Sequence, residues 1–286
     1  ITDARKFVEM IKALGFDHVF ESSFGVDLVA DKYRQLFEDF KGKNYISANC
    51  PVVVSYVEKF HPEILDNLAP IIPPMVAMAK VIHRKYGENL KTIYLGPCIA
   101  AKDEINRHEE DGQIDLALTF KELRELFNEY DIHEKNLEFS DFDEPLGEKG
   151  TLYPLSNGII QAAGIDEDLL EGKVITTEGK HNMTEAVHEF ESDIESIRQH
   201  FNIFYDEGCM MGPGNTHQGQ KFLRRSWVIE YAKRRMKKID RKKWEDHHYQ
   251  FADIDFSRTF KNDDQRLPYP SEERIKEILN QIGRKR

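Results

Sequence analysis

The placement of the chain's three cysteines, Cys50, Cys98 and Cys209, constrains its fold most strongly. Each cysteine stands in a turn rich in Gly, Pro or Asn, directly after a short apolar segment with the composition of a β-strand. In α/β folds ligands gather at the carboxyl ends of strands, so three such turns can converge on one site. A free cysteine is usually a small buried hydrophobe, but a structural thiol has no reason to choose this position three times. The cysteines therefore predict a metal or cluster site.

The spacing of the cysteines favours a cluster over a single zinc ion. Thiolates suit both zinc and iron-sulfur clusters. A zinc site usually includes one close pair such as Cys-x-x-Cys, and the sequence has none. An odd number of distant cysteines also argues against a disulfide framework. Ligands contributed singly by distant loops fit a cluster buried between two lobes.

Length and charge narrow the class of protein. A chain of 286 residues suffices for one large domain of two lobes or for two ordinary domains. Its net charge of -11 argues against a nucleic-acid-binding surface, and the basic segment 224–243 is interpreted as a solvated helix face. No run of about 18 apolar residues and no signal peptide is present, so we expect no membrane partner and a cytoplasmic location. The chain begins with Ile1, which suggests a piece of a longer protein.

Helical and strand patterns alternate along the chain, which predicts an α/β fold. Thr2 is placed to cap the first helix. Ser22, Ser23 and Gly25 are interpreted as a turn, and 138–150 as an exposed loop between lobes. Short strands are predicted at 18–21, 43–48, 91–95, 114–118, 173–177 and 201–205. Helices are predicted, among others, at 75–86, 120–130, 158–163, 184–200 and 271–282.

Three motifs around the cysteines resemble the signatures of iron-only (FeFe) hydrogenases, which read approximately TSCCPxW, MPCxxK and ACxGGCxxGGG. The chain has SANCPVV at 47–53, GPCIAAKDE at 96–104 and EGCMMGPG at 207–214. The run SYVEKFHPEILDNLAP at 55–70 is very close to the family's own run after its first signature. The likeness extends from about Phe16 to about Gly219 and covers most of the domain. Any one motif alone is weak, but the three together are specific.

The resemblance implies roles for the cysteines. In the family, the signature cysteines hold a 4Fe-4S cubane that is linked to a two-iron catalytic subsite. Cys50 and Cys98 match cubane ligands, and Cys209 matches the cysteine that bridges the cubane and the two-iron subsite. A second alignment puts Cys209 on an earlier cysteine and Pro213 on the bridge. We prefer the first alignment because the second loses both flanking glycines.

Departures from the family pattern fall on the two-iron subsite and its proton supply. The proton-donating cysteine beside the first ligand is Asn49 here, and an amide has no proton to exchange at neutral pH. The methionine that packs on the subsite is Gly96. The lysine that holds its cyanide ligand falls on Ala101, with Lys102 one place late. The family's proton path uses acidic residues. In this chain their positions fall near Tyr33 and Leu36, which have no acidic side chain.

The fourth ligand of the cubane is an open question. The family's remaining cubane cysteine falls on Tyr205, with Asp206 beside it. A carboxylate is ionised at neutral pH, whereas a tyrosine must first lose a proton with a pKa of about 10. Asp206 is therefore the easier oxygen ligand; the alternatives are Tyr205, a water, or no cluster at all. His217 lies near Cys209 in the sequence, but a lone histidine in such a loop is more often a surface residue.

Together these patterns predict an α/β domain of two lobes, each a mainly parallel sheet flanked by helices, with a 4Fe-4S cluster in the cleft between the lobes. Residues 1–245 form the hydrogenase-like domain, and 246–286 form an extension with a connector helix to a downstream domain. The expected role is redox or small-ligand sensing without hydrogen turnover, inside a longer protein with ferredoxin-type or signalling domains. The alternatives are an active hydrogenase or other reductase, and an iron-sulfur assembly scaffold.

Overall fold

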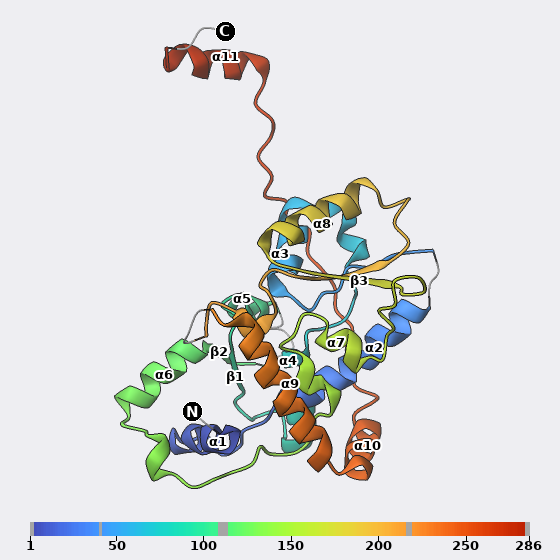
Figure 1. The fold of residues 1–286 in the computed structure, drawn as a ribbon. Coiled ribbons are helices and arrows are strands. Elements are labelled where there is room, and N and C mark those ends of the chain that lie inside the picture. Colours follow the sequence, from blue (N-terminus) through green and yellow to red (C-terminus); the bar gives the residue numbers. More distant parts are fainter. Residues whose placement is uncertain (1–2, 40–41, 108–113, 216–218, 284–286) are drawn as a thin grey trace.

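Two pairs of parallel strands form the sheets of the computed structural model, which describes residues 3–39, 42–107, 114–215 and 219–283. Within these residues, β1 (Ile93–Gly96) pairs with β2 (Leu116–Thr119), and β3 (Val174–Glu178) pairs with β4 (His200–Phe204). Helices surround both pairs (Figure 1). The predicted α/β fold with mainly parallel strands is confirmed in the form of two small sheets.

Helices make up most of the regular structure. Proline opens α3 and α4, because a proline at the start of a helix removes an N–H that would have no helical partner. The described α-helices are α1 (Ala4–Ala13), α2 (Ser23–Glu38), α3 (Pro51–Phe60), α4 (Pro74–Tyr86), α5 (Ala101–Asn106), α6 (Phe120–Glu129), α7 (Gly158–Ala162), α8 (Lys180–Ser192), α9 (Lys221–Lys238), α10 (Arg241–Gln250) and α11 (Glu272–Gln281). Shorter 3-10 helices are η1 (Pro62–Asn67), η3 (Glu134–Asn136), η4 (Lys149–Leu152) and η5 (Cys209–Met211).

Four of the predicted strands correspond to β1 to β4, with ends displaced by one or two residues. The predicted strands at 18–21 and 43–48 are wrong, because these segments make only isolated bridges. Ile46 bridges both Leu68 and Phe201, so it lies between two extended segments. The chain then turns into α3, and the ladder does not continue.

Two helix predictions are corrected at their ends. The helix predicted at 184–200 is α8, which starts at Lys180 and stops at Ser192, because the chain must return to the start of β4 at His200. The first helix is capped by Asp3, whose side chain accepts the N–H of Arg5. Thr2 lies outside the described residues.

The turn predicted at Ser22, Ser23 and Gly25 is wrong, since these residues lead into and begin α2, a buried helix. Gly25 allows close packing there instead of a turn. A Cβ atom added at Gly25 would lie 2.5 Å from the carbonyl oxygen of Pro74, at the start of α4. The missing side chain therefore lets the α2 and α4 backbones approach each other.

The segment 138–150 was predicted as an exposed loop. Its last residues are hydrogen-bonded to Asp27 of α2. The buried Asp27 carboxylate accepts the backbone N–H groups of Glu148 and Gly150, both at 2.6 Å. It also accepts the indole N–H of Trp244 at 2.9 Å. Burial raises the pKa of Asp27 to about 6, although these three donors favour its charged form. The end of this loop is therefore part of the packed body, whereas its first residues are exposed.

Buried side chains form three clusters in the part of the chain that the structure describes. The largest lies among α2, α4 and α7, the second among α3, α8 and β4, and the third between α1 and α6. Cys98 packs on the first cluster, whereas Cys50 and Cys209 belong to or pack on the second. The three cysteines thus lie where two of the cores meet.

Residues 251–265, which we call the strap, cross from the end of α10 to α3. Phe251 and Phe256 are buried in the largest cluster, and the N–H of Ile72 donates to the Phe256 carbonyl at 2.9 Å. Further along, the N–H of Lys261 donates to the Glu58 carboxylate at 2.9 Å. The strap thereby fastens α4 and α3 together. The expected domain boundary at residue 245 falls inside α10, and it stays a prediction.

A buried ion pair anchors the strap to α5. The Arg258 guanidinium lies 2.8 Å from the Glu104 carboxylate, and both side chains are almost fully buried. Arg107 lies 3.6 Å from the same carboxylate and also pairs with Glu58 of α3. This network joins the two helices that follow Cys50 and Cys98.

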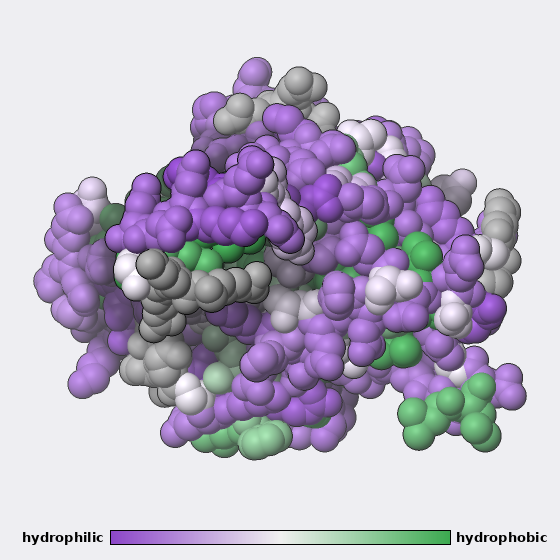
Figure 2. Space-filling view, turned by 90° about the horizontal axis from the view of Figure 1, so that it is seen from above, coloured by the Kyte–Doolittle hydropathy of each residue, from purple (hydrophilic) through white to green (hydrophobic). Residues whose placement is uncertain are grey.

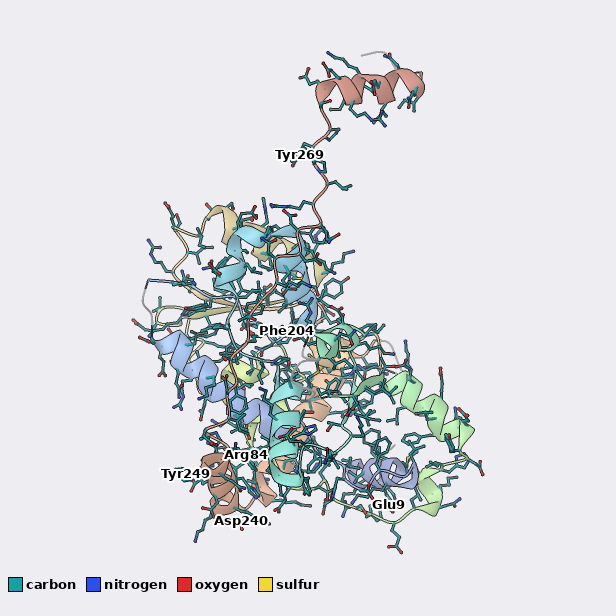
Figure 3. The ribbon with its side chains drawn as sticks, turned by 180° about the vertical axis from the view of Figure 1, so that it is seen from behind. Glu9, Arg84, Phe204, Asp240, Tyr249 and Tyr269 are labelled. Carbon is teal, nitrogen blue, oxygen red and sulfur yellow. The ribbon has the colours of Figure 1, made fainter. Side chains whose placement is uncertain are left out.

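Beyond the strap the chain leaves the body. Figure 3 shows Tyr269 on the extended segment that leads to α11, which stands apart from the rest (Figures 1 and 3). Ile275, Ile278 and Ile282 of this last part are exposed. The helix predicted at 271–282 is confirmed, while its role as a connector stays a prediction.

The surface is mostly hydrophilic in the view from above, with hydrophobic groups in small separate patches (Figure 2). None of the described helices is long and apolar enough to cross a membrane.

Arg258→Met tests the strap anchor. It leaves the Glu104 carboxylate buried without its main partner, so we expect a loss of about 3–5 kcal/mol in the free energy of unfolding. Urea denaturation followed by circular dichroism measures this loss. The double variant Arg258→Met/Glu104→Leu should recover a large part of it. Arg266→Met is the matched control, because Arg266 pairs with Glu63 at the surface and should change stability little. Equal effects of the two arginine variants would contradict the assignment.

Candidate functional site

Cys50 caps the N-terminus of α3, directly before Pro51. The preceding residues are held in extended form by buried hydrogen bonds, such as that from the N–H of Ala48 to the Tyr33 hydroxyl oxygen at 3.0 Å. Backbone N–H groups of Tyr205 and Val53 point at the thiol. A helix N-terminus favours a negative charge, so this position suits a thiolate ligand.

Cys98 stands between β1 and α5 in a similar arrangement. The N–H groups of Ala100 and Ala101 point at its thiol. Gly96, at the end of β1, is covered by the ring of Tyr94. A Cβ atom added at Gly96 would lie 2.5 Å from that ring. Tyr94 therefore fills the space into which a larger side chain at position 96 would point.

Cys209 follows β4 and begins η5. Gly208 before it has a φ of +80°, and a Cβ atom there would lie 2.8 Å from the Pro154 carbonyl oxygen. Gly212 after it allows equally close contact with the Pro97 carbonyl, which also accepts the N–H of Gly214 at 2.7 Å. Gly208 therefore lets the Cys209 turn pack against Pro154, and Gly212 and Gly214 let it pack against the Cys98 turn.

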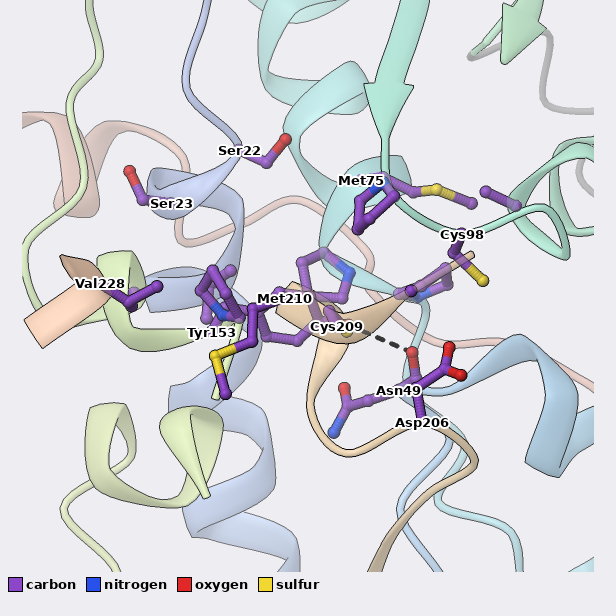
Figure 4. A pocket seen from close by; sticks show the side chains of 18 of the residues that line it. Ser22, Ser23, Asn49, Met75, Cys98, Tyr153, Asp206, Cys209, Met210 and Val228 are labelled. Carbon is purple, nitrogen blue, oxygen red and sulfur yellow. Dashed lines mark hydrogen bonds between the residues drawn. The ribbon is translucent and has the colours of Figure 1, made fainter. Parts of the chain in front are cut away.

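All three cysteines line one cavity of about 490 Å³. Figure 4 shows Cys98, Cys209 and Asp206 around it, together with Asn49. The other lining residues are mostly apolar or aromatic, including Met75, Tyr94, Pro97, Tyr153, Phe204 and Met210. The convergence that the sequence predicts is thus present in the structure.

Burial raises the pKa of each of the three thiols above its ordinary value. For Cys50 the pKa rises to about 11. For Cys209 the charges of Cys50, Cys98 and Asp206 add to the effect of burial. Burial is also the main cause of the raised pKa of Cys98. Three buried thiols with raised pKa values form a site that requires a cation to become fully ionised.

The donor set fits a cluster better than one metal ion. Among the residues that the structure describes, no group of three or more His, Cys, Asp or Glu side chains is arranged to hold a single ion. Thiolates around one zinc ion must approach one another to about 4 Å. A cubane presents its irons at separate corners, so its thiolates can stand farther apart. Three thiols around a cavity of this size, with an apolar wall, fit that requirement.

Asp206, and not Tyr205, is a lining residue of the cavity. Asp206 is half-buried, and burial raises the pKa of its carboxyl. The side chain of Tyr205 packs against the cluster of α3 and α8, while its backbone N–H points at Cys50. The geometry makes Asp206 the better placed of the two, and its role as a ligand stays a prediction.

Asn49 also lines the cavity. It is 2% exposed, and neither its side-chain oxygen nor its side-chain nitrogen has a hydrogen-bond partner within the described ranges. Its backbone carbonyl accepts the Tyr153 hydroxyl at 3.1 Å (Figure 4). A buried amide with both polar atoms unpaired is costly unless something in the cavity bonds it.

The structure also locates the other residues that differ from the family's pattern. Ala101 is a lining residue and offers only a methyl group. Lys102 is not a lining residue and pairs with Glu122 of α6. Tyr33 and Leu36 lie in α2, within and against the largest core cluster. His217 lies outside the described residues.

Several lining residues were not predicted. Trp227, Val228 and Tyr231 come from α9, inside the segment interpreted as a solvated basic face. Their spacing at i, i+1 and i+4 is the signal of an apolar stripe on that helix. Tyr153 follows η4 and carries no comparable signal.

Comparison with known proteins agrees with this geometry. The family model for the C-terminal domain of the iron only hydrogenase large subunit matches residues 2–213. The chain is 28% identical over 182 residues to NADP-reducing hydrogenase subunit HndD from Solidesulfovibrio fructosivorans. It is 27% identical over 176 residues to iron hydrogenase 1 from Clostridium pasteurianum. Each alignment covers 55% of this chain and 31% of the relative, so the chain spans about a third of these relatives' length. A third relative is the cytosolic Fe-S cluster assembly factor NAR1 from Yarrowia lipolytica, 26% identical over 149 residues, covering 46% of this chain and 30% of the relative.

Solved structures share the fold. A variant of the apo [FeFe]-hydrogenase HydA1 from Chlamydomonas reinhardtii superposes with a TM-score of 0.71 at 15% identity, over 91% of this chain and 88% of that one. A structure of HydA(deltaEFG), described by its stepwise H-cluster assembly, gives a TM-score of 0.66 at 16% identity, over 92% of this chain and 89% of that one. At these identities the likeness concerns the fold alone.

Proposed function

Because the chain belongs to the family of C-terminal domains of iron-only hydrogenase large subunits, we propose that it holds a 4Fe-4S cluster and acts as a redox or small-ligand sensing module without hydrogen turnover. Cys50, Cys98 and Cys209 are the proposed ligands. The observation that carries the proposal is their convergence on one cavity that Asn49 also lines. Asn49 stands where the family has its proton-donating cysteine.

The cluster, when bound, supplies reversible one-electron chemistry. The protein supplies the thiolates and their surroundings. The N-terminal amides of α3 and α5 point at Cys50 and Cys98 and favour their ionised forms. Burial opposes ionisation, so binding of the cluster and release of the thiol protons occur together. The apolar wall keeps solvent from the site, which tunes its potential.

Among the described residues, those at the positions of the family's proton donor and subsite lysine, and the tyrosine beside them, do not act as proton donors. Asn49 carries no exchangeable proton at neutral pH. Lys102 is engaged with Glu122, outside the cavity. Tyr153 donates its hydroxyl to a backbone carbonyl, and burial raises the pKa of this hydroxyl well above its usual value. A positioned donor typically contributes about 100- to 10,000-fold to a rate, so its loss argues against turnover.

Three thiolates leave one corner of a cubane without a protein sulfur. Asp206 is the side chain that offers oxygen there. A corner held by oxygen exchanges its ligand more easily than one held by thiolate, which gives an external ligand or an oxidant a point of access. The proposed sensing role rests on this position. Ferredoxin-type or signalling domains of a longer protein are the proposed receivers, with α11 as the connection.

Two other functions have a specific observation in their favour. Two of the relatives are named as hydrogenases, which favours an electron-transferring enzyme. A third is named as an iron-sulfur assembly factor, which favours a scaffold that binds partner proteins. A scaffold would show no response of the cluster to small ligands, whereas an enzyme would turn over a substrate.

The first prediction concerns the iron content. Protein purified without oxygen, or reconstituted with iron and sulfide, should hold about one cubane, as measured by iron analysis and electron paramagnetic resonance of the reduced form. Cys50→Ser, Cys98→Ser and Cys209→Ser should each lower the iron content. Ile99→Ser is the matched control, because Ile99 is next to Cys98 but exposed. Full iron loading of the triple cysteine variant would refute the ligand set.

The second prediction concerns hydrogen. The loaded protein should neither evolve nor oxidise hydrogen in a gas-chromatographic assay, even after treatment with hydrogenase maturation proteins. Asn49→Cys alone should not restore turnover, because Ala101 and the Tyr94 ring over Gly96 still differ from the family pattern. Hydrogen production that survives Cys209→Ala would refute the alignment of the site.

The third prediction concerns Asp206. Asp206→Cys should give a more oxygen-tolerant cluster with a changed reduction potential, since a thiolate replaces an oxygen ligand. Asp206→Ala should speed conversion to a three-iron form, which has a distinct paramagnetic resonance signal. Glu207→Ala is the control, because this neighbouring acid is exposed and pairs with Lys221. If both Asp206 variants keep the cluster lifetime and potential of the parent, another group is the ligand.

A further inference from the structure

The strap, residues 251–265, is the part of the chain that connects α11 to the body. Figures 1 and 3 show α11 apart from the body, at the end of the extended segment that carries Tyr269. No residue of α11 is buried. An effect of the cavity on α11 that travels through this chain must therefore pass along the strap.

The two halves of the strap are held differently. In the first half, Phe256 is buried in the largest cluster, and the N–H of Arg258 donates to the Pro70 carbonyl at 3.2 Å. The second half lies along the end of α3, where the N–H of Gln265 donates to the Lys59 carbonyl at 2.9 Å, and most of its residues are exposed. Arg258 is the last buried residue in the described part of the chain. It is therefore the anchor of the exposed half.

Arg258 is fastened to the helix that follows Cys98. Its guanidinium lies 2.8 Å from the Glu104 carboxylate, and the Glu104 side chain is 0% exposed. The N–H of Glu104 donates to the Ala100 carbonyl at 3.0 Å, in the first turn of α5. The N–H of Ala100 in turn points at the Cys98 thiol. About one turn of helix therefore separates the cysteine from the residue that holds the strap.

The charge at position 98 and the charge of Glu104 act on each other. Burial is the main cause of the raised pKa of the Cys98 thiol, and the negative charges of Asp206 and Glu104 add to it. Arg258 lies against Glu104 and compensates its charge. A negative charge at position 98 is therefore less favourable when Arg258 has left. Because such coupling is reciprocal, the same negative charge makes it harder for Arg258 to leave.

We propose that the strap responds to the charge of the cysteine site: negative charge at Cys98 strengthens the hold of Glu104 on Arg258, and loss of this charge loosens the strap. Ligation of the proposed cluster leaves Cys98 as a thiolate, and reduction adds an electron beside it. Release of residues 258–265 lengthens the tether of α11 by up to about 27 Å. This inference rests on the proposed cluster binding and adds the route by which the site acts on the rest of the chain.

The first test needs no cluster. Cys98→Asp and Cys98→Asn differ in charge at about pH 8 but hardly in size. In the iron-free protein, hydrogen exchange of residues 258–265, measured by mass spectrometry, should be about tenfold slower in Cys98→Asp, as expected for one partly screened charge. Exchange of α1 is the internal control, because α1 packs in a separate cluster and should be equal in both variants. Equal exchange of the strap would overturn the proposal.

The second test removes the connection. Arg258→Met/Glu104→Leu deletes the ion pair without leaving a buried charge. In this background, Cys98→Asp and Cys98→Asn should give equal exchange of the strap. Arg266→Met is the matched control, since Arg266 pairs with Glu63 at the surface just beyond the strap, and it should keep the difference. A difference that persists in the double variant would mean that Arg258 is not the connection, which contradicts the inference.

The reduction potential of the cluster-loaded protein gives the reciprocal measurement. Arg258→Met leaves the charge of Glu104 uncompensated, so the reduced form is disfavoured and the potential should fall. A change of about tenfold in the reduction equilibrium is about 59 mV. Arg258→Lys and the double variant Arg258→Met/Glu104→Leu keep the charge balance and should keep the potential near that of the parent. A purely structural role of Arg258 would not give this order, and an unchanged potential in Arg258→Met would refute the coupling.

Iron analysis of the same samples separates this proposal from the cluster proposal. If the protein never loads iron but the iron-free variants show the charge-dependent exchange, the cluster proposal fails and the strap proposal stands. If the protein loads iron but the strap exchanges equally with and without it, the strap proposal fails and the cluster proposal stands.

Discussion

The close backbone contact between the Cys98 and Cys209 turns is the constraint on which the site depends. The Pro97 carbonyl accepts the N–H of Gly214, and a side chain at Gly212 would collide with the same carbonyl. These turns belong to different core clusters, so their contact joins the two halves of the molecule. It also closes the cavity around the thiols. Without glycine at these positions the third thiol would stand away from the other two.

A network of ion pairs also helps to position the cysteines. Glu104 and Arg107 in and after α5, Glu58 in α3, and Arg258 in the strap connect the helices that begin beside Cys50 and Cys98. Breaking a buried ion pair costs far more than breaking one at the surface. The network therefore holds α3 and α5 against each other, which preorganises two of the three thiols before any cofactor enters.

Much of the site could be predicted because each cysteine is marked by the few residues next to it in the sequence. Each cysteine follows a short apolar segment and stands in a turn, and those patterns survive in the fold. What could not be predicted depends on distant contacts. Gly25 has the pattern of a turn residue until Pro74 of α4 is seen against it. Trp227 and Tyr231 lie in a segment whose many basic residues indicate a solvated helix. Only the folded chain shows that one face of α9 covers the cavity.

The packing of the Tyr94 ring over Gly96 makes each of these two positions depend on the other. A methionine at position 96, as the family has, would collide with the Tyr94 ring, since even a Cβ atom there would lie 2.5 Å from it. A small residue at 94, in turn, would open a void beside Gly96, which is destabilising in a packed interior. A larger side chain at position 96 therefore requires the Tyr94 ring to move, so the side chains at positions 94 and 96 are coupled. Because the two residues are in contact, the effects of substitutions at positions 94 and 96 on stability should not add.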